Sequence, residues 1–185
     1  MTSYCDIAPD HPVHAYYHDN EYGFPVTDEA VLFERLALEI FQAGLSWEIV
    51  LKKRKGTFDA FDGFQVDKVA AYGEKDTERL LGNPGIIRNR LKVASIIDNA
   101  NRLVEMRANG GFSGWLDHNH PMNRKEWTKL FKKTFRFTGG EIVNEFLMSV
   151  GYLPTPHERG CPVYDRIVAL NPPWNQADPA VFSTD

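Results

Sequence analysis

The sequence has only two cysteines, Cys5 and Cys161, in 185 residues. Two cysteines are too few for the disulfide framework of a small secreted domain, so we expect them to be thiols or metal ligands in a reducing compartment. No apolar run approaches the roughly 18 residues of a membrane-spanning helix. The N-terminus also lacks the basic and apolar segments of a signal peptide. These absences predict a cytoplasmic protein without a membrane partner.

An excess of positive charge is absent too, because the formal net charge is -4 at pH 7. This balance argues against a protein that coats nucleic acid through bulk charge. Lysines and arginines nevertheless gather in three runs, at residues 52–55, 88–92 and 129–133. Any contact with phosphate would therefore be made by local patches. A solvated helix end is the alternative interpretation of each run.

Repeats, low-complexity segments and long linkers are missing, and nearly every long segment has helical periodicity. A hydrophobic fraction of 43% is enough for one compact domain. We expect an all-α fold in a single domain over residues 1–185, with an irregular tail over residues 162–185. The expected helices cover residues 27–44, 46–56, 67–72, 76–81, 88–106, 125–131 and 141–150. Gly44 and Gly56 are expected to end the first two.

A Gly-Asn-Pro-Gly turn joins two predicted helices in ERLLGNPGIIRNRLK. Gly82 and Gly85 would let another backbone approach closely, and the start of the second helix favours an anion. Arg88, Arg90 or Lys92 could add positive charge. The turn therefore resembles a helix-hairpin-helix motif that holds a DNA phosphate. An ordinary corner between two helices is the alternative, and the local sequence does not decide between them.

Four possible metal ligands lie near the two ends of the chain: Cys5, His18, His157 and Cys161. Two thiolates and two imidazoles would give Zn²⁺ a closed tetrahedral set, which is typical of a structural site. Such a site would join the N- and C-terminal segments. Because only the last two residues are closely spaced, isolated packed or exposed side chains remain the alternative.

A single carboxylate, Glu39, stands among apolar residues in LEIFQAGLSWEIVLKKRK, residues 38–55. An unpaired buried carboxylate is costly, so it is either paired, exposed or required by a site. From the residues alone we favour a surface pair with Arg35, four positions earlier. Such a pair contributes only about 0.2–0.5 kcal/mol.

Four stretches of the sequence form a specific combination: YHDNEYGFP, LALEIFQAGLSWEIVLKKR, NPGIIRNRLK and the final H-x-x-x-C. Together they resemble the 3-methyladenine DNA glycosylase I family, which belongs to the helix-hairpin-helix DNA glycosylases. The resemblance implies that fold, with a structural zinc on Cys5, His18, His157 and Cys161. It also implies a base pocket, with Glu39 at its floor and Tyr17 and Trp47 as its walls.

The same resemblance implies a DNA-binding surface and an activity. Gln42, Gly44 and Leu45 would probe the DNA, with Leu45 filling the space of a flipped nucleotide, while the hairpin residues Gly82, Gly85 and Arg88 would hold backbone phosphate. The expected activity is that of a monofunctional glycosylase. It would act as a monomer on double-stranded alkylated DNA and release 3-methyladenine, with 3-methylguanine as a further candidate.

Two functions of other classes remain open. One is a zinc-stapled DNA-binding protein without catalysis, and the other is a helical enzyme that acts on a free nucleobase. The chain is a divergent member, because Ile7 stands where the family usually has the tryptophan that covers the base, and Tyr22 replaces another tryptophan. We expect the lid to be missing or replaced. No catalytic role is assigned to Glu141, Asn144 or Glu145, which follow Gly139.

Overall fold

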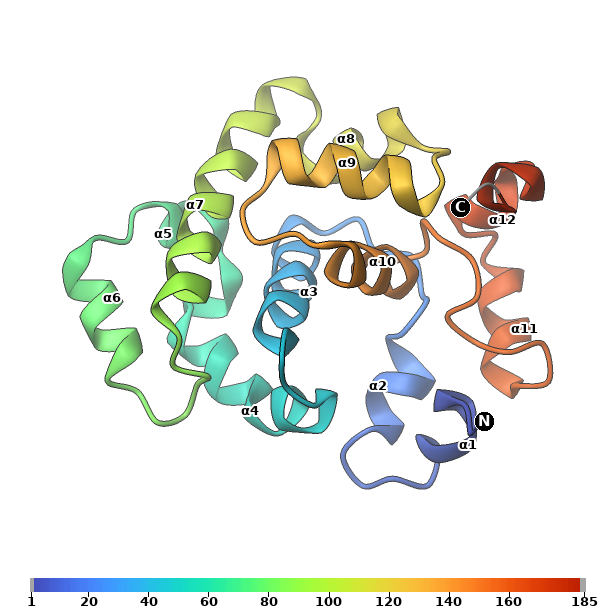
Figure 1. Cartoon of the computed structure of the whole chain (residues 1–185), viewed down its shortest axis with the longest axis horizontal. Coiled ribbons are helices and arrows are strands. Elements are labelled where there is room, and N and C mark those ends of the chain that lie inside the picture. The colour runs from blue at the N-terminus through green and yellow to red at the C-terminus, as the bar shows by residue number, and fades with distance from the viewer. Residues whose placement is uncertain (1, 184–185) are drawn as a thin grey trace.

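The computed structural model describes residues 2–183, and all regular structure in this range is helical, as predicted (Figure 1). The α-helices are α1 (Tyr4–Ile7), α2 (Ala15–Asn20), α3 (Glu29–Gln42), α4 (Trp47–Ala60), α5 (Val66–Ala70), α6 (Glu74–Leu81), α7 (Arg90–Met106), α8 (Gly111–Asn119), α9 (Arg124–Thr134), α10 (Gly140–Ser149), α11 (Pro162–Ala169) and α12 (Pro173–Gln176). Short 3₁₀-helices are η1 (Asp62–Phe64), η2 (Arg107–Asn109) and η3 (Pro179–Ser183). Each of the seven predicted helices has a counterpart.

Helix α3 lies at the centre of the molecule and contacts α4, α7, α8 and α10 (Figure 1). It begins where the Asp28 side chain accepts a hydrogen bond from the Val31 N–H at 3.0 Å, an N-cap that satisfies one free backbone donor. Every residue from Leu32 to Phe41 is buried. Full burial of a side chain such as Phe33 contributes about 1.5–3 kcal/mol, so α3 anchors the core.

The two ends of the chain lie on the same side of the molecule, where α1 and α2 face α11 (Figure 1). A small apolar cluster joins them, with Val163 and Ile167 of α11 packed near Cys5 and Phe24. The Arg166 guanidinium also donates to the Asp19 carbonyl at 2.9 Å. Apolar packing and this hydrogen bond therefore hold the N- and C-terminal segments together. Over residues 2–183, no helix has the length and apolar character needed to cross a membrane.

The C-terminal segment differs from the prediction. Residues 162–185 were expected to be irregular, but α11, α12 and η3 occupy most of residues 162–183. Pro162 is the first residue of α11, a position where its fixed φ and missing N–H cost nothing. Helix α8 was also not predicted, because its glycine-rich start hides the helical spacing of the buried Phe112 and Leu116. The expected irregularity of the last two residues falls outside the described range.

Helix α4 also differs, because it continues through Gly56 to Ala60. This glycine does not end the helix. A Cβ added at Gly56 would lie 2.6 Å from the Gly85 carbonyl oxygen, so the glycine is needed where α4 passes the hairpin backbone. Lys53 also joins α4 to the hairpin, because its Nζ donates to the Pro84 carbonyl oxygen at 2.7 Å.

We predict that Gly56→Ala lowers the free energy of unfolding by about 1–3 kcal/mol through overpacking against Gly85. Urea denaturation measures the change. Gly114→Ala, inside α8, is the matched control. Its new Cβ would lie 3.7 Å from the Asn109 carbonyl oxygen, which is an ordinary van der Waals distance. The control should be stabilised by about 0.5–1 kcal/mol. Equal stability of the two variants would contradict the close approach of α4 to the hairpin.

Candidate active site and metal centre

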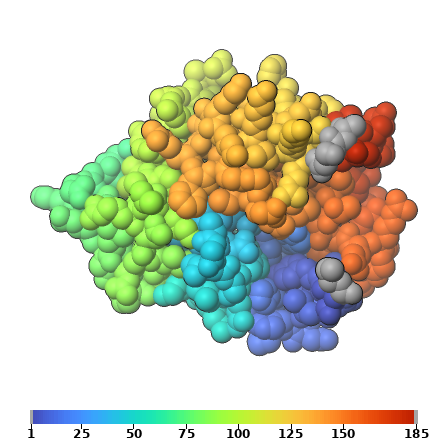
Figure 2. Space-filling view, viewed as in Figure 1, coloured from blue at the N-terminus to red at the C-terminus, as the bar shows by residue number. Residues whose placement is uncertain are grey.

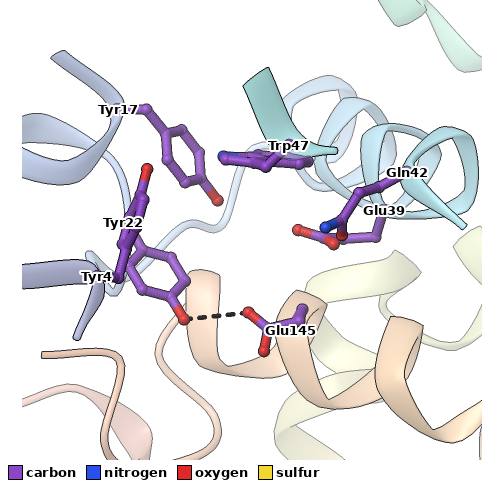
Figure 3. A pocket seen from close by; sticks show the side chains of 7 residues that line it. All are labelled: Tyr4, Tyr17, Tyr22, Glu39, Gln42, Trp47 and Glu145. Carbon is purple, nitrogen blue, oxygen red and sulfur yellow. Dashed lines mark hydrogen bonds between the residues drawn. The ribbon is translucent and has the colours of Figure 1, made fainter. Parts of the chain in front are cut away.

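A cavity of about 300 Å³ lies between the N-terminal segment, α3, α4 and α10, and we call it the aromatic cavity (Figure 3). Its lining residues are Tyr4, Tyr17, Tyr22, Glu39, Gln42, Trp47 and Glu145. The volume is at the lower end of the range for small-molecule sites. The cavity therefore suits one small planar ring system. Segments from both ends of the chain are needed to form it.

Aromatic rings form one side of the aromatic cavity. The ring centroids of Tyr17 and Trp47 are 5.1 Å apart in an edge-on arrangement, and Tyr17 stacks on Tyr22 at 5.7 Å. Trp47 is the first residue of α4, which Ser46 caps by accepting from the Ile49 N–H at 3.4 Å. The cap fixes where the indole enters the cavity. Tyr17 and Trp47 thus lie together, as their predicted roles require.

Glu39 faces this cavity from α3 and is only 4% exposed (Figure 3). The predicted surface pair with Arg35 is wrong, because Arg35 is itself buried and binds Glu21 at 2.9 Å. From residues 2–183, no hydrogen bond or ion pair reaches the Glu39 carboxylate. Burial raises the pKa of Glu39 well above its usual value, the Glu145 charge raises it further, and Arg35 opposes the shift. The cavity therefore contains a carboxylate that lacks a partner among the described residues.

The other charges around α3 are balanced. Arg54 binds Glu34 at 2.7 Å and Glu21 at 2.8 Å, and Arg35 also binds Glu21, so two arginines and two glutamates form one network. Arg35 also donates to the Tyr17 hydroxyl at 3.3 Å and lies over its ring, with Cζ 5.0 Å from the centroid. The network positions Tyr17 and leaves Glu39 as the unbalanced charge.

Tyr4 and Glu145 line the aromatic cavity without having been predicted there. Ile7, at the usual position of the covering tryptophan, is 54% exposed and does not line the cavity. Tyr4 supplies an aromatic ring to the cavity from the same short helix, α1. The sequence did contain one signal for Tyr4, because it directly precedes Cys5. A metal site that includes Cys5 would fix the position of Tyr4 as well. Glu145 gave no signal, since helical spacing alone does not show which helix α10 faces.

A second hollow, the rim groove, adjoins the aromatic cavity and has a volume of about 700 Å³. It is lined by Glu39, Gln42, Ala43, Gly44, Leu45, Ser46, Gly139, Gly140, Glu141, Ile142 and Glu145. The segments that form both hollows, in blue, cyan and orange, meet near the middle of the face in Figure 2. Gly44 has φ of +80°, which turns the chain after α3. Leu45 is 39% exposed beside it. The predicted probing residues therefore share the rim.

Lys92 does not serve the hairpin as expected. Its side chain is 4% exposed, and Nζ donates to the carbonyl oxygens of Phe41 at 2.8 Å and Ala43 at 2.6 Å. These acceptors lie at the C-terminal end of α3, where carbonyls lack helical partners. Lys92 therefore fixes the loop that follows α3 and is unavailable for phosphate.

The hairpin between α6 and α7 presents Gly82, Gly85 and Arg88 as exposed residues. Part of its expected donor set is already used, because the Gly85 N–H donates to the Asn83 side chain at 2.8 Å. The Asn89 side chain caps α7 by accepting from the Lys92 N–H at 3.1 Å. Arg90 pairs with Glu74 at 3.4 Å. Both arginines are exposed, but among residues 2–183 only Arg90 has an ion-pair partner, so Arg88 is the hairpin arginine left for a phosphate contact.

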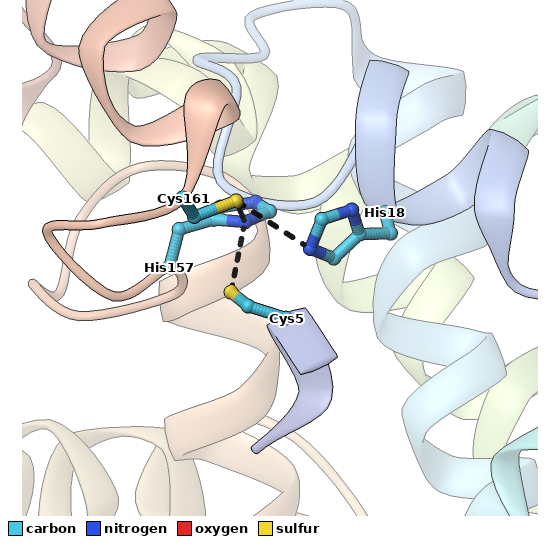
Figure 4. Close-up of side chains that lie close together, drawn as sticks. All are labelled: Cys5, His18, His157 and Cys161. Carbon is cyan, nitrogen blue, oxygen red and sulfur yellow. Dashed lines mark hydrogen bonds between the residues drawn. The ribbon is translucent and has the colours of Figure 1, made fainter. Parts of the chain in front are cut away.

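The four predicted metal ligands Cys5, His18, His157 and Cys161 form one cluster, with ligand atoms within 4.8 Å of one another (Figure 4). Both sulfur atoms lie 3.6 Å from His157 Nδ1, and Cys161 Sγ lies 3.9 Å from His18 Nε2. Tetrahedral zinc with bonds of about 2.3 Å to sulfur and about 2.0 Å to nitrogen would separate its ligands by roughly 3.5 Å. The cluster can hold a metal ion.

Both imidazoles of the cluster are oriented by a second contact. His18 Nδ1 lies 2.6 Å from the Asp19 carboxylate, and His157 Nε2 lies 2.7 Å from the Tyr22 carbonyl oxygen. Metal-binding histidines almost always use the second ring nitrogen in this way. The arrangement leaves His18 Nε2 and His157 Nδ1 facing the sulfur atoms.

The fold and the aromatic cavity define a helical protein whose cavity has the size and lining to accommodate one planar ring between aromatic faces and a carboxylate. A family model of methyladenine glycosylases matches residues 7–129. The chain belongs to this family. Glu145 and three of the cluster residues, Cys5, His157 and Cys161, lie outside the matched range.

Relatives cover nearly the whole chain. DNA-3-methyladenine glycosylase 1 of Escherichia coli (strain K12) is 38% identical over 181 residues, which is 86% of this chain and 96% of the relative. DNA-3-methyladenine glycosylase of Haemophilus influenzae is 35% identical over 88% of this chain and 98% of its own length. The solved 3-methyladenine DNA glycosylase I from Staphylococcus aureus, studied for 3-methyladenine recognition, has a TM-score of 0.77 at 30% identity, covering 88% of this chain and 96% of its own.

Lys92→Met should lower the free energy of unfolding by about 1–3 kcal/mol, because it leaves the Phe41 and Ala43 carbonyls without their donor. Chemical denaturation of the purified variant provides the measurement. Lys132→Met, at an exposed position of α9, should stay within about 0.5 kcal/mol of wild type. If both variants match wild type, Lys92 does not stabilise the end of α3.

Proposed function

We propose that this chain is a monofunctional DNA glycosylase that hydrolyses the bond between 3-methyladenine and deoxyribose in double-stranded alkylated DNA, as a cytoplasmic monomer. The buried Glu39 carboxylate in the aromatic cavity, which has no hydrogen-bond or ion-pair partner within residues 2–183, carries this proposal. The E. coli and H. influenzae relatives are both named DNA-3-methyladenine glycosylases. 3-Methylguanine remains a further candidate base.

The cavity suits an extruded cationic base. Adenine methylated at N3 is cationic while attached to the sugar, and each aromatic face attracts it by about 0.5–2 kcal/mol. Tyr17 and Trp47 supply such faces, and Tyr4 adds another at the position of the lid. Glu39 accepts hydrogen bonds from the exocyclic amine and the ring edge, which are charge-assisted and therefore strong.

The contacts of Lys92, which binds the C-terminal end of α3, favour hydrolysis over lyase chemistry. The base leaves as a neutral molecule, so water can displace it without a covalent intermediate. A Schiff base needs an unprotonated, free amine. Lys92 Nζ donates to two carbonyl oxygens and is held away from such chemistry. The product is an abasic site in an intact strand.

The rim groove and the hairpin would hold the DNA. Leu45 is exposed beside Gln42 and Gly44, where it can fill the gap left by an extruded nucleotide. An apolar wedge of this kind replaces the stacking that base flipping removes. Gly82, Gly85 and Arg88 would contact a phosphate at the hairpin.

The alternative of an inactive DNA-binding protein rested on the missing tryptophan at Ile7, and Tyr4 weakens it by lining the aromatic cavity. An enzyme on free nucleobases would bind DNA weakly and with little salt dependence. Strong binding of duplex DNA that falls with added salt would exclude that alternative.

We predict that Glu39→Gln lowers the rate of 3-methyladenine release from methylated DNA by about 10²-fold, a loss of about 2.7 kcal/mol in transition-state stabilisation. Chromatography of the released bases measures the rate. The variant should also bind free 3-methyladenine more weakly. Its free energy of unfolding should match or exceed that of wild type, because the amide removes a buried charge.

Glu78→Gln, at an exposed position of α6, is the matched control and should release the base at the wild-type rate. Failure of metal-replete wild type to release 3-methyladenine would refute the proposed activity. Full activity of Glu39→Gln would refute only the role of Glu39.

We further propose that the cysteine-histidine cluster binds a structural Zn²⁺ that joins the N- and C-terminal segments. The donor set of two thiolates and two imidazoles, its near-tetrahedral spacing and the two oriented imidazoles support this assignment. Four protein ligands leave no coordination position for substrate. Zinc would therefore act on stability and not on the glycosidic bond.

Elemental analysis of purified protein should find about one zinc per chain, which matches one four-ligand site. Cys161→Ser should lose most of the zinc and unfold at a lower temperature, because metal binding adds to the folding free energy. Glu158→Gln, an exposed neighbour outside the ligand set, should retain zinc. Undiminished zinc content and stability in Cys161→Ser would exclude the four-ligand site.

A further inference from the structure

Three residues line both the aromatic cavity and the rim groove: Glu39, Gln42 and Glu145. An extruded nucleotide with its base in the cavity and its backbone in the groove must pass its glycosidic bond through this shared boundary. Side chains at the boundary are therefore close to the sugar carbon C1′. This inference rests on the proposed function, because it places the base in the aromatic cavity.

Glu145 approaches the boundary from a different helix than Glu39. It belongs to α10, and Figure 3 shows its carboxylate across the cavity from α3. The Tyr22 hydroxyl donates to Glu145 Oε2 at 3.1 Å and holds the side chain. A carboxylate has about four acceptor positions on its two oxygens, so this bond leaves capacity for a water molecule. Glu39 would already be used by the edge of the base.

We propose that Glu145 is a catalytic carboxylate of this chain that orients the attacking water and accepts its proton. The water oxygen forms a bond to C1′ as the bond from C1′ to N9 of the base breaks. The electron pair of the broken bond stays on the base, which leaves as neutral 3-methyladenine. The water proton passes to the Glu145 carboxylate and later to solvent. No further reactant is required.

The electrostatics of the boundary favour the same role. Positive charge develops on the sugar as the bond breaks, and a fixed carboxylate near C1′ stabilises it. Burial raises the pKa of Glu145, while the Tyr22 hydrogen bond acts in the opposite direction. A carboxylate with a raised pKa is a better proton acceptor near neutral pH. Glu145 lies beyond residues 7–129, which the family model matches.

The test compares Glu145→Gln with Glu39→Gln in two assays. One is the single-turnover rate of 3-methyladenine release from methylated duplex DNA, and the other is the affinity for free 3-methyladenine. Glu145→Gln should lower the rate by about 10²-fold, the lower range for general base catalysis. It should leave the affinity for the free base within about twofold of wild type, because water and sugar are absent. Glu39→Gln should lower both quantities.

The Gln variant keeps the shape of the side chain and an oxygen for the Tyr22 hydroxyl, so its free energy of unfolding should stay close to wild type. Glu145→Asp keeps the charge on a shorter side chain and should retain more activity than Glu145→Gln. Glu105→Gln, exposed on α7, is the control and should react as wild type.

Each remaining outcome decides the question. A wild-type single-turnover rate in Glu145→Gln would overturn the proposal while leaving the glycosylase function intact. Equal losses of rate and free-base affinity would also overturn it, because Glu145 would then be a base-reading residue. A wild type that releases no base would remove the proposed function and this inference together.

Discussion

Burial of α3 on all sides is the constraint on which the rest of the structure depends. From Leu32 to Phe41 the helix has no solvent face, so each charge on this segment needs a partner, because an unpaired buried charge is costly. Glu34 and Arg35 meet this requirement through Arg54 and Glu21. Glu39 lies on the same buried segment but has no such partner in the part of the chain that the structure describes. The protein thus retains one destabilising group where α3 borders the aromatic cavity, as expected for a residue kept for function.

The aromatic side of the cavity depends on the cysteine-histidine cluster. Tyr4 precedes Cys5 and Tyr17 precedes His18 in the sequence, while the Tyr22 carbonyl oxygen lies 2.7 Å from His157 Nε2. Each of these tyrosines is therefore attached to the cluster by one peptide or one hydrogen bond. The helices α1 and α2 are short and have little core of their own. A metal ion that holds the cluster in place would therefore also hold these three tyrosines in place. In this way a structural metal would support ligand binding in the cavity without contacting the ligand.

Local sequence signals predicted the helices with good caps, and long-range contacts caused the errors. Asp28 and Ser46 cap α3 and α4 through neighbours three residues away, which a sequence shows directly. Gly56 was expected to end α4 because its contact with Gly85 is remote in sequence. Lys92 was assigned to phosphate for the same reason, since its acceptors follow from the fold. In the site, periodicity alone misplaced Glu39 on the surface. Its place in a pocket with Tyr17 and Trp47 came from the family resemblance, and Glu145 required the packing of α10.

Two carboxylates at one small cavity also bear on how damaged and normal bases are distinguished. Glu145 raises the pKa of Glu39, because negative charges on the two carboxylates repel each other. A cationic base relieves this repulsion, whereas a neutral base of similar shape leaves it in place. Specificity is a difference between two affinities, and an unfavourable term for the wrong ligand contributes as much as a favourable term for the right one. Tyrosine faces attract both kinds of ring through stacking, but their electrostatic attraction acts on the cation alone. If the base occupies this cavity as proposed, the two carboxylates and the aromatic rings would therefore favour the same charged base, and the repulsion between Glu39 and Glu145 would contribute to that selectivity.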